Sequence, residues 1–411
     1  MKKIRILLCT LVLLLCAGCG TAPDTGTNHA GAVVGSNAPQ AEIRELTNAG
    51  PVAETPEGYY YANGHIVYFC PKGGSSMVPL CGKPNCQHNN KHCNAYLFLL
   101  EALDIYDGAL YTMDSPLKSR PDEIYFSKRK LDGSDHSLVA TLNTANYGIR
   151  GDMGFELKIY QGKAYVLMHE NVEGASEQDE HLVVVNLEDG TSTELAESFL
   201  REHTLMDMQC FHGKMYGWAS EDKDPNADVS KYALIEMDLS TGAITELPIH
   251  GRIASFVTET TVYYYDNDWL DYKTERPGFK EYDRETGTIR EFETPAGVEG
   301  FDYVTYDLDY VYAWSEGDAE KAGKLYILSR DYQLVDQCEL KRGEYIISMA
   351  SDCIFLADPY AERDPVHDMV CSVLCLQKSQ FGSHNLSAEK LEFVTPKAEW
   401  EDIKEDGSIL E

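Results

Sequence analysis

Short apolar runs separated by polar turns cover most of the chain, and one such unit recurs. A turn of small or polar residues precedes a run that carries an aromatic residue, as in Asp107-Gly108-Ala109-Leu110-Tyr111. The aromatic positions of the recurring unit are Tyr68, Tyr111, Tyr165, Tyr216, Tyr263, Tyr312 and Phe355. They lie about 40 to 55 residues apart, which is a spacing typical of repeat architectures.

Each unit contains a second turn, which follows an alternating apolar and polar run. Examples are the segments 182–190 and 233–242, where the run ends at Asn186 or Asp238 and the turn contains glycine. Glycine supplies the positive φ that tight hairpins need. Each unit is therefore predicted to form two hairpins, which together contain four short antiparallel strands.

Four short strands repeated at this spacing indicate an all-β fold, a β-propeller, because one four-stranded sheet cannot cover both of its own faces. The aromatic runs predict seven blades of four antiparallel strands. Six or eight are alternatives, because a cysteine-rich insert at 70–96 interrupts the first unit. The run Lys390–Val394 is the expected closing strand. No segment has a sustained helical period, which argues against an α/β enzyme fold.

Residues 1–18 have the pattern of a secretory signal peptide. A basic start precedes an apolar run of about ten residues, shorter than the roughly 20 that span a bilayer, and Ala17-Gly18-Cys19 follows. These last residues resemble the bacterial lipobox, although Cys16 stands where that motif usually has leucine. The resemblance implies that residues 1–18 are removed and that Cys19 is lipidated. The alternative is an ordinary signal peptide followed by a chance cysteine.

Residues 19–50 are rich in Gly, Ala, Thr, Asn and Pro, which predicts a flexible tether. The expected order is a lipid anchor on the extracytoplasmic face of the cell membrane, the tether, a propeller at 51–400 and an acidic tail at 401–411. The net charge of −32 becomes −35 when Lys2, Lys3 and Arg5 leave with the signal. Such an acidic surface repels phosphate backbones, so no nucleic-acid partner is expected.

The insert carries the most specific chemical motif of the chain. Cys81, Cys86, His88 and Cys93 bring three thiols and an imidazole into one short stretch. Three thiolates and a histidine suit one structural Zn²⁺ with tetrahedral geometry, and they leave no open coordination position for catalysis. A disulfide, either Cys81–Cys93 or Cys86–Cys93, is the competing interpretation, and free or redox-active thiols are a third.

Other cysteines and histidines of the chain are less favoured as metal ligands. His92 and Cys70 are substitute ligands for the metal interpretation. Five more cysteines are expected to behave as small buried hydrophobes: Cys210, Cys338, Cys353, Cys371 and Cys375. Because the cysteines after Cys19 are odd in number, at least one thiol is left without a partner within the chain.

The insert also carries a resemblance. The segment from Cys81 to Tyr96 is similar to the Cys-x-Lys-Pro-x-Cys-x-His and Cys-x-Ala-Tyr pattern of uncharacterised β-propeller lipoproteins from Gram-positive bacteria. In its general blade pattern the chain also resembles TolB-like propellers. The resemblance implies a lipoprotein propeller, and it implies no particular activity.

The sequence contains no nucleophile elbow, phosphate loop, dinucleotide fingerprint or zinc-protease helix. We therefore expect a cell-surface propeller that binds or scaffolds a glycan, a peptide or a partner protein. Candidate ligand-contact aromatics, whose rings can stack on sugars, are Trp218, Trp269 and Trp314. The alternative is a propeller-type polysaccharide hydrolase or lyase, whose carboxylates would lie on loops at unrelated sequence positions.

Overall fold

The computed structural model describes residues 51–97, 100–114, 123–143, 153–170, 180–220, 232–250, 255–266, 278–317, 321–364 and 369–396. The chain divides into two compact units, Met1–Ala38 and Pro39–Glu411, and the described residues all belong to the second. In these ranges no helix is long and apolar enough to cross a membrane. The predicted signal peptide 1–18, the lipidated Cys19 with its tether and the tail 401–411 lie outside the described residues and stay predictions.

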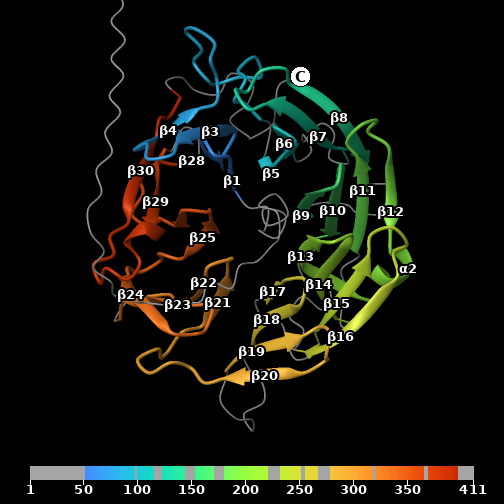
Figure 1. Ribbon diagram of the computed structural model, residues 1–411. Helices are drawn as coiled ribbons and strands as arrows, with labels where there is room; N and C mark the ends of the chain where they lie inside the picture. The colour runs from blue at the N-terminus through green and yellow to red at the C-terminus, as the bar shows by residue number, and fades with distance from the viewer. Residues whose placement is uncertain are drawn as a thin grey trace, which may run out of the picture. The chain divides into compact units, whose positions relative to one another are not determined.

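The described part is all-β and consists mostly of four-stranded antiparallel sheets, coloured in chain order from blue to red in Figure 1. The β5–β8 sheet consists of β5 (Leu100–Tyr106), β6 (Ala109–Asp114), β7 (Glu123–Lys130) and β8 (Ser137–Asn143). The β9–β12 sheet consists of β9 (Met153–Tyr160), β10 (Lys163–Glu170), β11 (Glu180–Asn186) and β12 (Ser192–Leu195). The β13–β16 sheet consists of β13 (Thr204–Phe211), β14 (Lys214–Ser220), β15 (Ala233–Asp238) and β16 (Ile244–His250).

Two further sheets have the same strand order. The β17–β20 sheet consists of β17 (Ser255–Val257), β18 (Thr261–Asp266), β19 (Gly278–Asp283) and β20 (Ile289–Phe292). The β21–β24 sheet consists of β21 (Tyr303–Tyr306), β22 (Tyr310–Ser315), β23 (Gly323–Ser329) and β24 (Leu334–Leu340). Short elements also occur: α2 (Glu197–Leu200), β27 (Arg363–Asp364), β28 (Met369–Val370) and η3 (Lys378–Gln380).

One sheet has eight strands and joins the two ends of the described chain. Its N-terminal half-sheet consists of β1 (Val52–Glu54), β2 (Gly58–Asn63), β3 (Ile66–Pro71) and β4 (Ser76–Pro79). Its C-terminal half-sheet consists of β25 (Ile346–Met349), β26 (Cys353–Leu356), β29 (Ser372–Gln377) and β30 (Glu389–Phe393). Strand β30 pairs in parallel with β4, so the run predicted to close the fold does join the first strands to the last. The predicted number of seven blades depends on counting these two halves separately.

Tight turns between the strands follow from residues that tolerate positive φ. The turn between β5 and β6 places Asp107 at φ 46° and Gly108 at φ 69°, and the turn between β13 and β14 places His212 at 47° and Gly213 at 73°. Two consecutive positive φ values match the right-handed twist of the strands that the turn connects. These turns are the ones that the repeat predicted.

Buried apolar clusters join each sheet to its neighbours. One cluster packs β5–β8 against β9–β12, another packs β9–β12 against β13–β16, and a third holds β13–β16, β17–β20 and β21–β24 together. A fourth joins β21–β24 to the C-terminal half-sheet, and the last joins both half-sheets to β5 and β6. The sheets therefore contact one another in a closed order, which is the architecture of a β-propeller.

The first unit of the predicted repeat differs from the others in the strand that carries its aromatic residue. Tyr68 lies on β3, the third strand of its half-sheet, whereas the other aromatic positions lie on second strands. Tyr60 on β2 occupies the equivalent place. The reason is that the turn at Asn63-Gly64-His65 connects β2 to β3, so it resembles a first turn in sequence but is a second turn in the sheet.

Candidate metal centre

The four residues of the predicted metal motif lie on one loop, 81–94, between β4 and β5. Both ends of this loop are held against the start of β3. The Leu80 N–H donates to the Val67 carbonyl (2.9 Å), the Val67 N–H donates to the Ala95 carbonyl (2.9 Å), and the Leu97 N–H donates to the His65 carbonyl (2.8 Å). The loop is therefore closed at its base by the backbone of the N-terminal half-sheet.

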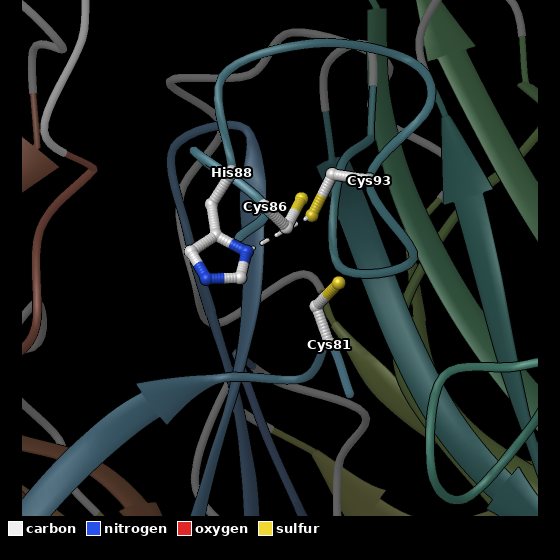
Figure 2. A group of neighbouring side chains, drawn as sticks. All are labelled: Cys81, Cys86, His88 and Cys93. Atoms are coloured by element: carbon white, nitrogen blue, oxygen red, sulfur yellow. Dashed lines mark hydrogen bonds between the residues drawn. The ribbon is translucent and has the colours of Figure 1, made fainter. Parts of the chain in front are cut away.

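The ligand atoms of Cys81, Cys86, His88 and Cys93 all lie within 4.8 Å of one another. Figure 2 shows the four side chains directed toward a common space, with His88 Nδ1 3.3 Å from Cys93 Sγ. Tetrahedral zinc, with Zn–S near 2.3 Å and Zn–N near 2.0 to 2.1 Å, separates its ligand atoms by roughly 3.4 to 3.8 Å. The four donors therefore need only small movements to enclose one ion.

Backbone bends allow Cys86 and His88 to reach the same space although a single residue separates them. Asn85 has φ 59° and His88 has φ 60°, both in the left-handed region that non-glycine residues rarely adopt. Turn hydrogen bonds from the Cys86 N–H to the Lys83 carbonyl (3.3 Å) and from the Cys93 N–H to the Asn90 carbonyl (2.9 Å) tighten the loop further. The loop thus has the conformation that a shared ligand site requires.

The environment of the thiols differs from one position to the next. Burial alone would raise the pKa of Cys81, but backbone N–H groups of Lys83 and Asn94 and the adjacent thiols outweigh it, so that its pKa is lowered. Burial and the neighbouring sulfurs raise the pKa of Cys93. Burial lowers the pKa of His88, which keeps its imidazole neutral and able to donate a lone pair at neutral pH.

A buried arginine of the next sheet faces the loop, and sequence reasoning missed it. Arg129 on β7 is 1% exposed. Its Nη1 donates to the Asn94 carbonyl (2.8 Å) and its Nη2 to Thr112 Oγ1 (3.4 Å). Burial lowers the pKa of this guanidinium, whereas Asp114 and Cys93 nearby act in the opposite direction. An arginine remains charged even so.

The charge of Arg129 fits a metal–thiolate centre. Three thiolates, one neutral imidazole and a divalent zinc carry one excess negative charge, and the positive charge of Arg129, which acts on both Asp114 and Cys93, partly offsets it. A buried charge is stable only when it is paired and hydrogen-bonded. The donor set and its buried counter-charge therefore both fit structural zinc.

The other interpretations of the cysteines find less support. All nine cysteines in the described ranges have free thiols in this structure, which draws neither Cys81–Cys93 nor Cys86–Cys93 as a bonded pair. A disulfide would also join only two of three sulfurs that here converge together. Neither Cys70 nor His92 belongs to the cluster; the His92 carbonyl instead accepts a hydrogen bond from Lys83 Nζ.

The burial of the remaining predicted cysteines and tryptophans agrees with the predictions at some positions and differs at others. Cys210, Cys353 and Cys375 are buried as predicted, whereas Cys338 and Cys371 are half-buried. Trp218 is fully buried at 0% exposure, a position that suits core packing rather than contact with a ligand. Half-buried Trp314 stacks on Tyr303, which is 47% exposed, with ring centroids 5.3 Å apart. Trp269 lies outside the described residues.

Comparisons with known proteins give no family. No protein-family model matches the chain, and no curated protein matches it. Among solved structures, the β-propeller domain of the trilobed protease from Pyrococcus furiosus aligns with a TM-score of 0.46 at 8% identity, over 86% of this chain and 97% of that one. An uncharacterised protein from Listeria monocytogenes aligns with a TM-score of 0.42 at 9% identity, over 71% and 84%. A TolB-like protein from Agrobacterium tumefaciens aligns with a TM-score of 0.37 at 7% identity, over 60% and 80%.

Proposed function

We propose that this chain is a lipid-anchored, extracytoplasmic binding or scaffold protein, built as a seven-bladed β-propeller whose Cys81–Cys93 loop is held by one structural zinc ion. Five four-stranded sheets and the two halves of the eight-stranded sheet support the count of seven blades. The lipobox-like Ala17-Gly18-Cys19 and the polar tether that follows support the anchor. A glycan, a peptide or a partner protein is the expected ligand.

The convergence of four soft ligand atoms within 4.8 Å is the observation that carries the zinc assignment. Because three sulfurs and one nitrogen fill a tetrahedral site, the ion would have no position open to water or substrate. A closed site of this kind stabilises a fold, and it does not perform catalysis. The loop's contacts with β3 and with Arg129 support the same role.

A propeller-type hydrolase or lyase is the alternative, and one buried carboxylate that it could use has a structural role instead. Glu156 on β9 and Asp207 on β13 lie close together, and burial and Asp207 raise the pKa of Glu156. Yet both oxygens of Glu156 accept backbone hydrogen bonds, from the N–H of Asp207 (2.9 Å) and of Met208 (3.0 Å). This carboxylate joins two neighbouring sheets, which accounts for its burial without a catalytic role.

Elemental analysis tests the zinc assignment on protein purified without oxidant. We expect about one zinc per chain, lost in Cys86→Ser and retained in the control Cys371→Ser, which changes a half-buried thiol outside the cluster. Absence of zinc with two thiols missing from a thiol titration would establish a disulfide instead. Absence of zinc with every thiol free would overturn both interpretations.

Membrane fractionation tests the anchor. In a bacterial host that lipidates exported proteins, the wild-type chain should appear in the membrane fraction and incorporate a palmitate analogue. Cys19→Ser should abolish both properties, and Cys16→Ser should abolish neither. Equal labelling of the wild type and Cys19→Ser would remove the lipoprotein assignment.

A further inference from the structure

Neighbouring sheets of this fold meet through one recurring contact. The residue that follows the third strand of a sheet is the recurring element, and in five sheets it lies beside the aromatic residue on the second strand of the preceding sheet. These contact positions are Lys72, Leu131, Leu187, Leu239, Arg284, Arg330 and Lys378. In five of them the backbone N–H donates to a carbonyl in the first turn of the same sheet, at Glu57, Gly162, Gly213, Thr260 and Asp352. The contact positions are therefore structurally equivalent.

A cation fills the junction between β13–β16 and β17–β20. Arg284 Nη2 donates to Tyr216 Oη (2.5 Å) and to Glu236 Oε2 (2.7 Å), and the guanidinium lies 5.0 Å from the centroid of the Tyr216 ring. Glu236 is the residue directly opposite Tyr216 on the third strand. Tyrosine, glutamate and arginine thus close this junction with matched charges.

The next junction has the same composition. Tyr263 on β18 lies opposite Glu281 on β19, and Arg330 of the β21–β24 sheet lies 3.8 Å from the centroid of the Tyr263 ring. Arg330 also donates to the Asp307 carbonyl (3.1 Å). An arginine stacked on tyrosine beside a glutamate is therefore a feature that the chain uses twice to close a junction.

The junction between β5–β8 and β9–β12 differs at two of the three positions. Tyr111 keeps its place, but the residue opposite it is Lys128 instead of glutamate, and the contact position is Leu187 instead of arginine. The charge on the third strand is thus reversed and the filling cation is absent. A cavity of about 410 Å³ lies there, lined by Tyr106, Asp107, Tyr111, Lys128, Gln161, Gly162, Lys163, Asn186, Leu187 and Glu188. We call it the Tyr111 groove.

Leucine at the contact position does not by itself explain the groove. In the junction between β9–β12 and β13–β16, Tyr165, Val184 and Leu239 belong to one buried apolar cluster. Val184 lies opposite Tyr165, so that junction is filled by three apolar side chains. In the Tyr111 groove, Leu187 packs against the cluster that contains Tyr111, but the residue opposite Tyr111 is the exposed Lys128, which adds no apolar packing and forms no ion pair in the described residues.

The lysines of the groove are available to a ligand. Lys128 and Lys163 are exposed, and Lys128 Nζ lies 5.5 Å from the centroid of the Tyr111 ring. In the part of the chain that the structure describes, neither lysine forms an ion pair, although Asp107 and Glu188 also line the groove. Two cations of this groove are therefore free to pair with an anion from outside the chain.

We propose that the Tyr111 groove binds an acidic sugar, a uronate unit of a polysaccharide or glycan. Its carboxylate would pair with Lys128 and Lys163, its hydroxyls would bond to the amides of Gln161 and Asn186, and its apolar ring face would pack on Tyr106. The volume lies near the lower end of the range of about 300 to 1,000 Å³ for ligand pockets, which suits a mono- or disaccharide. This inference rests on the proposed binding role and names its ligand class.

Calorimetric titration of the full-length protein with digalacturonate tests the proposal. We expect saturable binding that weakens about tenfold or more in Lys128→Gln and in Lys163→Gln. The matched control is Lys324→Gln, because Lys324 also lies over a tyrosine ring, that of Tyr326 at 5.8 Å, but far along the chain on β23. The control should bind as the wild type does. The neutral galactose disaccharide of the same linkage should not bind measurably.

A second variant closes the groove without removing its tyrosine. Lys128→Glu combined with Leu187→Arg recreates the tyrosine, glutamate and arginine of the two filled junctions, so the protein should keep its melting temperature and lose digalacturonate binding. Retained binding would overturn the groove as the site. So would the absence of wild-type binding to digalacturonate at about 10 mM, or preferential binding of a triglutamate peptide.

Failure of the groove can be separated from failure of the binding role. A glycan and peptide array probed with the same wild-type protein should return acidic glycans that the Lys128→Gln variant no longer retains. Ligands retained equally by both proteins would overturn the groove and leave the proposed binding role standing. An array with no ligand at all would overturn both.

Discussion

The β5–β8 sheet meets its two neighbours in opposite ways. Toward the N-terminal half-sheet, the Cys81–Cys93 loop is pressed onto it: buried Arg129 holds the Asn94 carbonyl, and the turn at Gly133 touches Leu80. Toward β9–β12, the sheet faces the Tyr111 groove, where two lysines have no acidic partner in the described residues. In the first junction the buried cation is hydrogen-bonded by groups of the protein itself. In the second junction the two lysines remain available to a ligand.

The difference teaches how one repeat can serve both stability and recognition. Both junctions contain a cation from the β5–β8 sheet, on the same strand and only one residue apart: Lys128 and Arg129. Adjacent side chains of a strand point to opposite faces. Arg129 therefore contacts the Cys81–Cys93 loop, whereas Lys128 lines the Tyr111 groove. Burial then decides their roles, since Arg129 is 1% exposed and Lys128 is exposed.

Loss of the metal should have the largest effect on this comparison. We expect Cys86→Ser, or a zinc chelator, to lower the melting temperature by about 5 °C or more, because metal binding energy contributes directly to folding. Scanning calorimetry measures the shift, and limited proteolysis should locate new cleavage in the loop 81–94. The Tyr111 groove should still bind digalacturonate. An unchanged melting temperature in chelator would mean that the loop needs no metal.

Removal of the buried positive charge of Arg129 should have the second largest effect on stability. Arg129→Met leaves the Asn94 carbonyl without its donor and the metal centre without its cation, which should cost about 3 kcal/mol in the free energy of unfolding. Zinc affinity should also fall, by about ten- to a hundredfold, as for other groups that support metal ligands. Urea denaturation and competition with a chromogenic chelator measure the two effects. The neighbouring exposed cation provides the control: Lys130→Gln should change neither quantity.

Addition of a methyl group at the same junction should have a smaller effect. Gly133 has φ +81°, and a Cβ there would lie 2.3 Å from the Leu80 carbonyl oxygen and 3.3 Å from Asn94 Cβ. Gly133→Ala should therefore destabilise the protein by about 1 to 3 kcal/mol through strain and displacement of the loop base. Gly108→Ala serves as the control, since φ there is also positive, +69°, but nothing lies within 4 Å of the added Cβ. Equal destabilisation by both would assign the whole effect to backbone strain.

Much of the fold was predictable because its strands and turns depend on residues that are close together in the sequence. The spacing of Tyr111, Tyr165, Tyr216 and their equivalents predicted recurring strands that follow a turn, and glycine turns predicted the hairpins. The cluster of three thiols and one imidazole in the loop was predictable too, since Cys81 and Cys93 are near in sequence. Arg129 and the Tyr111 groove were not, because both depend on which strands face one another across a junction. No spacing in the sequence reveals that Leu187 takes the place of Arg284.

The ion pair of Glu236 and Arg284, in a filled junction, should have a smaller effect on stability, and that effect should depend on pH. Burial would raise the pKa of Glu236, but the Tyr216 hydroxyl and Arg284 outweigh it and lower the pKa. A carboxyl with a depressed pKa contributes stability above its unfolded pKa of about 4.3 and loses it as the pH falls through the folded value. Arg284→Leu should therefore destabilise the protein by about 1 to 2 kcal/mol at pH 7 and by less at pH 3. A difference that does not shrink in acid would assign the effect to packing alone.

The smallest effect should come from rebuilding that ion pair in the open groove. Lys128→Glu alone leaves a carboxylate near Leu187, and Leu187→Arg alone brings two cations together, so each single change should be neutral or slightly destabilising. Together they should be coupled favourably by about 0.5 to 1 kcal/mol, because the pair remains partly exposed to solvent. A double-mutant cycle from urea denaturation measures this coupling. Absence of coupling would mean that the two positions do not meet across the groove, and that the filled and open junctions are not versions of one contact.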